Sequence, residues 1–253
     1  MNPAIQLKDV HMHFDKGTLL EKHILKGLNL ELRPREFATL IGTNGAGKST
    51  LMNLITGDLI PSSGGVLFSG RPVENLRTEQ RAPHIARIFQ DPRLGTFPQL
   101  SIEENMALAM QRGEKAGFGL ALNATRRSLF REELSHLGIG LENRLKDKVS
   151  HLSGGQRQAL CLIMATLKKA DIFLLDEPTA ALDPKMAELV LRATREIAEK
   201  QKLCTLMVTH SMKHALEYGT RTLLLHQGRI ALDLQGDTRG QTRPQDLLQW
   251  FED

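Results

Sequence analysis

GTNGAGKS, residues Gly42–Ser49, is the stretch that decides the fold of this chain. Its GxxxxGK[ST] spacing lets the backbone curl so that successive N–H groups converge on an anion. An apolar, strand-like run, Phe37–Ile41, precedes it. The helical pattern Ser49–Ile55 follows, and a helix N-terminus favours negative charge. A glycine-rich surface turn arising by chance would not need these neighbours. The stretch therefore predicts a phosphate-binding loop between a strand and a helix.

The side chains of this loop suit a nucleotide and its metal ion. Lys48 would supply a compact positive charge to the β- and γ-phosphates, and Ser49 would offer a hydroxyl to Mg²⁺. The predicted ATP-binding residues of the loop are Gly42, Thr43, Asn44, Gly45, Ala46, Gly47, Lys48, Ser49 and Thr50.

A second motif, LSGGQ at Leu152–Gln156, indicates the capped start of a helix. Ser153 is a good N-cap, Gly154 and Gly155 follow it, and an apolar run comes behind. The free N–H groups at such a helix start can hold a second anion. An ordinary capped helix would have the same local pattern, so the motif is specific only in combination with the others.

Two apolar runs end in side chains that can act on a phosphate. Asp171–Pro178 contains Asp176 and Glu177, and His210 comes shortly after Cys204–Val208. The C-terminal ends of parallel strands lie at the ligand crevice. We therefore expect Asp176 to hold the metal, directly or through water, Glu177 to orient the attacking water, and His210 to contact the γ-phosphate. The alternatives are solvated loop acids and a histidine satisfied by a neighbouring backbone group.

Taken together, the motifs resemble the ATP-binding subunit of an ABC transporter over nearly the whole chain. Six motifs occur in the order typical of that family. They are the phosphate loop, the glutamine loop at Gln90, the signature LSGGQ, the acidic strand, the ALD segment Ala181–Asp183 and the switch histidine, His210. The run RIFQDPRLGT and the compact length are similar to ATPases of bacterial importers for amino acids and related small solutes. The resemblance implies that Phe14 stacks on adenine, although tyrosine is commoner there, that Gln90 senses Mg²⁺ and the lytic water, and that Asp183 links two nucleotide sites across a dimer.

The same resemblance assigns roles to the remaining motif positions. It implies a homodimer in which the signature of one copy touches the nucleotide of the other. The implied catalytic residues are Lys48, Gln90, Glu177 and His210; the implied Mg²⁺ ligands are Ser49, Gln90 and Asp176; the implied ATP contacts from the signature are Ser153, Gly154, Gly155 and Gln156.

The fold implied is α/β: a P-loop NTPase core with a mixed or parallel sheet, an N-terminal antiparallel β part and an inserted α-helical subdomain. We expect one domain, 1–253, with a nucleotide-binding core of 1–93 and 169–253 and a helical lobe, 94–168, that carries the signature. Further expected elements are strands at 4–14, 23–33, 66–70, 85–89, 221–226 and 228–234, a capping box of Ser101 with Glu104, and helices at 123–139 and 244–251.

Composition limits the partners and the location. Lysine plus arginine exceed aspartate plus glutamate by only four, 33 against 29, which suits phosphate-rich ligands and an anionic membrane without demanding nucleic acid. No apolar stretch approaches the ~20 residues of a membrane span, and no basic-then-apolar signal segment opens the chain. Cys161 and Cys204 lie in apolar stretches typical of buried free thiols, which suits a reducing cytosol. We expect a peripheral protein on the cytoplasmic face of the cell membrane.

The function expected is ATP hydrolysis, with ATP and Mg²⁺, that powers solute import. Its partners would be a second ATPase subunit, integral membrane permease subunits and, indirectly, a substrate-binding protein. Asp91–Ser101 joins Gln90 to the helical lobe, and Phe97 within it is a candidate anchor for a permease helix; a rigid loop over core is the alternative. Two alternative functions are the ATPase of an exporter or lipid-extraction system and a soluble ABC protein. Soluble ABC proteins of DNA repair usually carry coiled coils or zinc motifs, and those of translation carry a second cassette; we find neither in this sequence.

Overall fold

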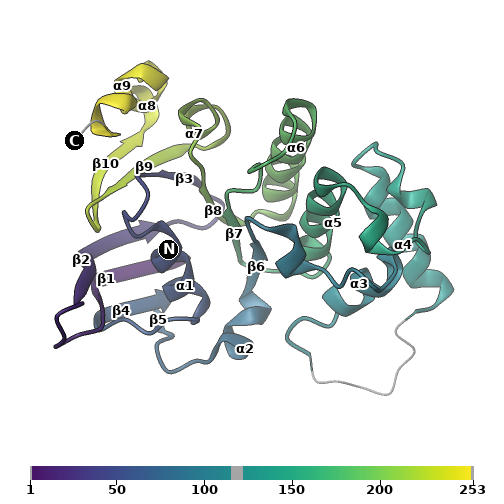
Figure 1. The fold of residues 1–253 in the computed structure, drawn as a ribbon, viewed down its shortest axis with the longest axis horizontal. Helices are drawn as coiled ribbons and strands as arrows, with labels where there is room; N and C mark the ends of the chain where they lie inside the picture. The colour runs from purple at the N-terminus through teal and green to yellow at the C-terminus, as the bar shows by residue number, and fades with distance from the viewer. Residues whose placement is uncertain (1, 115–121, 252–253) are drawn as a thin grey trace.

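The central sheet is mixed and mostly parallel (Figure 1). The computed structural model describes residues 2–114 and 122–251. Within them the strand order is β10–β9–β3–β8–β7–β6. Every neighbouring pair is parallel except β9 and β10. The strands are β3 (Phe37–Ile41), β6 (Ile85–Ile88), β7 (Ile172–Asp176), β8 (Cys204–Val208), β9 (Arg221–His226) and β10 (Arg229–Gln235). β3 and β8 are buried along their whole length, as expected for strands covered on both faces.

A second, antiparallel sheet is built from the N-terminal part of the chain. Its order is β2–β1–β4–β5, with β1 (Ile5–Phe14), β2 (Lys22–Leu32), β4 (Ser63–Phe68) and β5 (Arg71–Pro72). β4 begins three residues before the strand expected at 66–70 and ends at Phe68, because the chain turns at Ser69–Gly70, where both residues have positive φ. The predicted division into an antiparallel part and a parallel core is confirmed.

α-Helices form the other regular elements of the described chain. They are α1 (Lys48–Thr56), α2 (Thr78–Arg81), α3 (Ile102–Ala109), α4 (Ala124–Ser135), α5 (Gly154–Thr166), α6 (Pro184–Gln201), α7 (Met212–Tyr218), α8 (Gly236–Gln241) and α9 (Pro244–Leu248). Short 3₁₀ turns occupy Ala82–His84, Pro92–Gly95, Leu141–Asn143, Val149–His151 and Gln249–Phe251.

Two expected helices are shorter in the structure. The helix expected over 123–139 is α4, capped by the Asn123 side chain and ended at Ser135, because the chain leaves the helix through Gly138 with φ 65°. The helix expected over 244–251 is α9 followed by a 3₁₀ turn. The capping box of Ser101 with Glu104 at the start of α3 is confirmed.

α3, α4 and α5 gather at one end of the molecule (Figure 1). Their buried apolar side chains form a cluster that includes Ile102, Phe130 and Leu160 and reaches Val190 on α6. α5 also sends Leu162 into the cluster around β7. The helical region therefore packs directly on the sheet through α5 and α6.

Arg81 joins α1 to the segment that follows the antiparallel sheet. Its side chain is 1% exposed and donates to the carbonyl oxygens of Leu54 (2.8 Å) and Ile55 (3.1 Å) at the end of α1. It also donates to those of Val73 (2.6 Å) and Leu76 (3.1 Å). A cation at a helix C-terminus interacts favourably with the helix dipole. The guanidinium thus stabilises the position of the helix that begins in the phosphate loop.

Replacing Arg81 with methionine should lower the free energy of unfolding by about 3 kcal/mol, because four carbonyl groups lose a charged donor in a buried site. Urea unfolding followed by circular dichroism measures the change. The control is Arg131→Met, at an exposed position of α4, with an expected effect within about 0.5 kcal/mol. Equal stability of the two variants would contradict this role of Arg81.

Candidate active site

The predicted phosphate loop connects β3 to α1 and packs against the antiparallel sheet. Gly47 has φ 107°, a backbone conformation that side-chain-bearing residues rarely adopt. A Cβ there would lie 2.8 Å from Leu25 Cδ2 and 3.2 Å from Ile24 Cγ2 of β2. β2 also meets the turn between β9 and β10, because the Lys26 N–H donates to the Gly228 carbonyl at 3.0 Å. Strand β2 therefore packs directly against the phosphate loop.

Lys48 lies inside this loop with only 7% of its surface exposed. Its ammonium donates to the carbonyl oxygens of Gly42 (2.8 Å) and Thr43 (3.0 Å). Burial lowers the pKa of Lys48, and the negative charges of Glu177 and Asp176 act against that shift. A poorly solvated cation beside free backbone N–H groups is a favourable place for phosphate oxygens.

The other loop positions differ in how far they are open to a ligand. Asn44, Gly45 and Ser49 are exposed, Thr43 and Thr50 are half-buried, and Ala46 is buried. Ser49 lies in the first turn of α1, where no acidic side chain competes for the N–H groups. Asn44, Gly45 and Ser49 are therefore the loop positions most open to a ligand.

The register of three parallel strands brings the other predicted residues to the same edge of the sheet. Val208 of β8 pairs with Leu40 of β3 and with Asp176 of β7. Beyond the strands, the Glu177 N–H donates to the Val208 carbonyl (3.0 Å) and the Thr209 N–H to the Leu40 carbonyl (3.1 Å). The phosphate loop, the two acids and the histidine therefore leave the sheet at the same height.

Glu177 lies between two of the other predicted catalytic side chains, Gln90 and His210. One carboxylate oxygen accepts from Gln90 Nε2 at 3.0 Å, and the other lies 2.6 Å from His210 Nε2. The backbone of Glu177 has φ 47°, in the left-handed region, which costs conformational free energy in a residue with a side chain. The structure therefore brings Gln90, Glu177 and His210 together, and the Glu177 backbone is held in a strained conformation beside them.

Asp176 ends β7 with a carboxylate that no hydrogen bond or ion pair engages among the residues the structure describes. Burial raises its pKa and Glu177 adds to this, while Arg87, Lys48 and His210 oppose the shift. A half-buried carboxylate and the exposed Ser49 hydroxyl are oxygen donors of the kind that Mg²⁺ binds. The residues present fit the predicted metal.

The signature motif caps α5 as the sequence predicts. The Ser153 hydroxyl accepts from the Gln156 N–H, and the Gln156 side chain accepts from the Ser153 N–H, both at 3.2 Å. Ser153 and Gly154 are exposed. In the described parts of the chain, no hydrogen bond joins these residues to Gly42–Ser49, and β6 and β7 stand between α1 and α5 (Figure 1). One copy of the chain does not bring its signature to its own phosphate loop.

Two further predicted contacts lie at the ends of elements. Phe14 is the last residue of β1, pairs with Lys22 and is partly packed on the core of the antiparallel sheet. Asp183 is exposed and caps α6 by accepting from the Met186 N–H at 3.0 Å. Their proposed contacts with adenine and with a second copy stay predictions.

Arg87 is a residue of the site that the sequence reasoning missed. It donates to Asp58 at 2.7 Å and to Asn53 at 2.8 Å, and its guanidinium lies 4.6 Å from the centre of the Phe89 ring. Among the neighbouring charges, that of Arg87 does most to lower the pKa of Asp176, against the rise that burial causes. One arginine within the apolar run Ile85–Phe89 was the available signal, because a strand of this kind rarely carries a charge without a partner.

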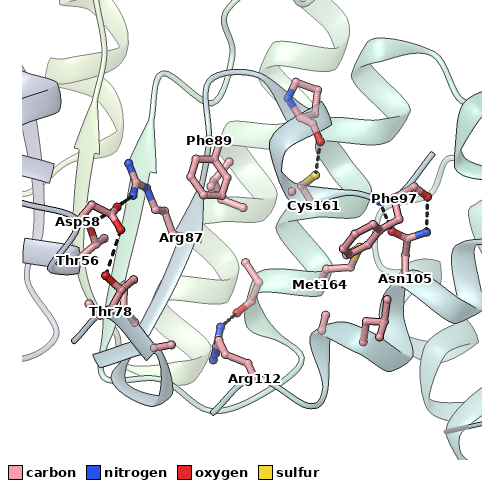
Figure 2. Close-up of a pocket in the computed structure, with 18 residues that line it drawn as sticks. Thr56, Asp58, Thr78, Arg87, Phe89, Phe97, Asn105, Arg112, Cys161 and Met164 are labelled. Carbon is pink, nitrogen blue, oxygen red and sulfur yellow. Dashed lines mark hydrogen bonds and ion pairs between the residues drawn. The ribbon is translucent and has the colours of Figure 1, made fainter. Parts of the chain in front are cut away.

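A groove of ≈ 570 Å³ runs beside this site towards the helical region (Figure 2). Figure 2 shows Asp58 and Arg87 at one end and Phe97 with Asn105 at the other. Phe97 is 60% exposed, as predicted, although Asn105 fixes its backbone through bonds to its N–H (2.7 Å) and carbonyl (3.0 Å). A rigid backbone thus presents an exposed aromatic ring.

Both cysteines are buried free thiols, which confirms the expectation from the sequence. Burial raises the pKa of each to about 12, so neither is a reactive thiolate at neutral pH. Within the described residues, no helix combines the length and apolar character that crossing a bilayer requires.

Comparison with known proteins agrees with this geometry. Residues 25–180 match the ABC transporter family model. A tyrosine transport ATP-binding protein of Clostridioides difficile is 38% identical over 98% of both chains. A thiamine import ATP-binding protein of Yersinia pseudotuberculosis is 34% identical over 88% of this chain and 89% of its own. Among solved structures, a dimeric ATP-binding cassette in a post-hydrolysis state with ADP and phosphate has a TM-score of 0.79 at 27% identity, over 91% of this chain and 98% of that one.

The family match covers more than half of the chain, and the relatives cover nearly all of it. Motif order, fold and these likenesses agree. The chain belongs to the ABC transporter family, as an ATP-binding subunit whose ATPase activity is coupled to transport.

Proposed function

We propose that two copies of this chain form a head-to-tail dimer that hydrolyses two ATP molecules and powers import of an amino acid or a similar small solute through separate permease subunits. The tyrosine transport relative supports this solute class, since it matches the chain from end to end. The thiamine import relative supports the direction of transport. A substrate-binding protein would deliver the solute, and the subunit would lie on the cytoplasmic face of the membrane.

The observation that carries the hydrolytic function is the Glu177 carboxylate held between Gln90 and His210, near the Lys48 ammonium. In phosphoryl transfer the protein mainly positions groups and offsets developing negative charge. The oxygen of a water bonds to the γ-phosphorus as the bond to the bridging oxygen breaks and ADP leaves. Glu177 orients that water and accepts its proton, while Lys48 and His210 stabilise charge on the phosphate oxygens.

Ser49, Asp176 and Gln90 are the residues that would hold Mg²⁺. When bound, Mg²⁺ neutralises charge on the β- and γ-phosphate oxygens. The raised pKa of Asp176 supports the assignment, because a carboxylate disfavoured by burial gains from a cation beside it.

Completion of the site requires the second copy. The start of α5 offers N–H groups and the Ser153 hydroxyl at an exposed position that does not meet its own phosphate loop. In a head-to-tail dimer these donors would complete the charge-stabilising groups around the partner's γ-phosphate. Asp183 would link the two sites. Closure around ATP and reopening after hydrolysis would be the step that drives transport.

The groove at Phe97 is the proposed contact with a permease. Its lining combines exposed apolar side chains with the Arg87–Asp58 pair, and it lies between the sheet and the helical region. Gln90 lies at the start of the segment that carries Phe97, so a change at the γ-phosphate could move the groove.

Glu177→Gln should keep ATP affinity and lower kcat at least 100-fold, because glutamine preserves the shape of the side chain but accepts no proton. The variant should accumulate as an ATP-bound dimer, which size measurement with ATP and Mg²⁺ detects. Glu196→Gln, at an exposed position of α6, is the matched control. A Glu177→Gln protein with the wild-type rate would exclude Glu177 as the base.

Mixed dimers test whether the signature acts on the partner's nucleotide. A Lys48→Ala chain paired with a Ser153→Arg chain should have one composite site with both defects and one with none, and should exceed both mutant homodimers in ATPase rate. A wild-type chain paired with the double mutant should have a defect in each site and stay inactive. The opposite pattern of activities would show that Ser153 acts within its own chain. Ser135→Arg, at an exposed position of α4, controls for the added charge.

Phe97→Ala should weaken co-purification with the permease at least tenfold and uncouple ATP hydrolysis from transport, since a buried aromatic anchor often carries ~2 kcal/mol or more. The isolated subunit should keep its Tm and its ATP affinity, because the ring is 60% exposed. Leu20→Ala, at a 71% exposed position in the turn between β1 and β2, is the control. A lowered Tm with unchanged co-purification would mean that Phe97 acts in folding rather than in coupling.

A further inference from the structure

Three histidines meet on the antiparallel sheet, away from the residues proposed to act on ATP. His11 and His13 alternate along β1, on the face opposite the buried Met12, and His23 of β2 pairs with His13 across the ladder. The His13 and His23 rings stack with centroids 3.8 Å apart, and the His11 and His23 rings lie 5.2 Å apart. One ring nitrogen from each histidine lies within 4.8 Å of the other two.

Two carboxylates orient the outer histidines. The Glu21 carboxylate lies 2.8 Å from His13 Nδ1, and that of Asp9 lies 3.3 Å from His11 Nε2. A carboxylate only accepts, so the hydrogen bond with Glu21 places the proton on His13 Nδ1 and the lone pair on His13 Nε2. Asp9 lies near His11 Nε2 without a hydrogen bond and favours a proton on that nitrogen, which leaves the lone pair on His11 Nδ1. Such carboxylate–histidine pairs are the usual outer partners of metal-binding imidazoles.

The third histidine completes the set of nitrogen donors. His23 Nε2 lies 3.1 Å from His11 Nδ1, so one proton is shared between them. Tautomer exchange of His23 moves this proton to Nδ1 and leaves the Nε2 lone pair free. Burial, with the nearby His13 and His11 rings, lowers the pKa of His23. Stacked rings disfavour protonation because two adjacent imidazolium charges would repel each other.

Glu21 has a second support that keeps it in place. Its other carboxylate oxygen accepts from the Gly17 N–H at 2.9 Å, and this bond and that with His13 lower the pKa of Glu21. Lys26, opposite His11 in the ladder, and Lys16, whose charge acts on Glu21, add positive charge nearby, and the carboxylates of Glu21 and Asp9 offset it. The surroundings therefore do not repel a cation.

We propose that His11, His13 and His23 bind one divalent transition-metal ion, with zinc the best match. Three imidazoles and a water form a known zinc ligand set with Zn–N distances of about 2.0–2.1 Å. Tetrahedral geometry at that length requires nitrogens about 3.3–3.4 Å apart, and the 3.1 Å between His11 and His23 is close to this. The His13 ring, which stacks on His23, would turn out of the stack to bring its lone pair to the same ion. Imidazole suits zinc, copper and nickel, whereas Mg²⁺ prefers oxygen, so this ion is distinct from the one expected at Asp176.

The test uses the full chain without an affinity tag and without nucleotide. Calorimetric titration with Zn²⁺ in a buffer that contains Mg²⁺ should give one ion per chain. Co²⁺ bound at the same site should give the intense visible bands of a tetrahedral complex. Zn²⁺ should raise the Tm, because an ion that binds the folded state stabilises it by mass action.

Variants separate metal binding from a purely structural cluster. His13→Gln should weaken Zn²⁺ binding by more than the roughly 10–100-fold that loss of an outer partner costs, and Glu21→Gln should weaken it about tenfold. His136→Gln, at an exposed position on the helical lobe, should leave affinity unchanged. His13→Gln without metal should keep the wild-type Tm.

The proposal is overturned if His13→Gln and His136→Gln bind Zn²⁺ equally well, or if bound Co²⁺ shows only the weak bands of an octahedral complex. It is also overturned if His13→Gln lowers the metal-free Tm while Zn²⁺ leaves the wild-type Tm unchanged, because the histidines would then be packing elements only. None of these measurements depends on ATP hydrolysis, so their outcome is independent of the proposed function.

Discussion

Parallel strand register is the constraint on which the rest of this structure depends. Because Val208 is level with both Leu40 and Asp176, three loops leave β3, β7 and β8 at one height. A shift of one residue in any of these strands would move its loop by about 3.3 Å and turn its side chains to the other face. The close pairs of Glu177 with Gln90 and His210 would then be lost. The chemistry of the site is thus set first by backbone pairing, and only then by the choice of side chains.

Some buried charged side chains of this molecule are paired within the protein, whereas others are left for a ligand to neutralise. Arg221 lies between Glu36 at 3.0 Å and Asp233 at 2.7 Å, and its pKa is raised even though burial alone would lower it. These two ion pairs satisfy all three charged groups and leave none of them free for a ligand. At the nucleotide site, burial lowers the pKa of Lys48 and raises that of Asp176, so neither charge is fully compensated by the protein. A ligand that carries both phosphates and a cation supplies what each of them lacks.

Features that depend only on neighbouring residues could be predicted from the sequence. The phosphate loop, the capped start of α5 and the strand–loop ends at Glu177 and His210 follow from local spacing, and the structure places them where the motifs require. Contacts between segments that are distant in the sequence could not be predicted in this way. The contact of Arg87 with Asp58 and Asn53 bridges about thirty positions of the chain, and the histidine cluster depends on the exact pairing of β1 with β2, which contains register shifts. Spacing alone also overestimated α4, because the turn at Gly138 overrides a pattern that would continue the helix.

The contact of β2 with Gly47 limits how this protein can diverge. Ile24 and Leu25 touch the position where a Cβ of residue 47 would lie, and the Ile24 carbonyl would overlap a Cβ at Gly228. A larger side chain at either strand position has no free space towards Gly47, so it would displace the phosphate loop, whereas the close contact with Gly228 is made by backbone atoms. The N-terminal hairpin can therefore accept new residues on its outer face far more readily than at Ile24 and Leu25. Along β2, the positions that contact the phosphate loop should therefore tolerate the fewest substitutions, although the neighbouring outer face of the same strand tolerates many.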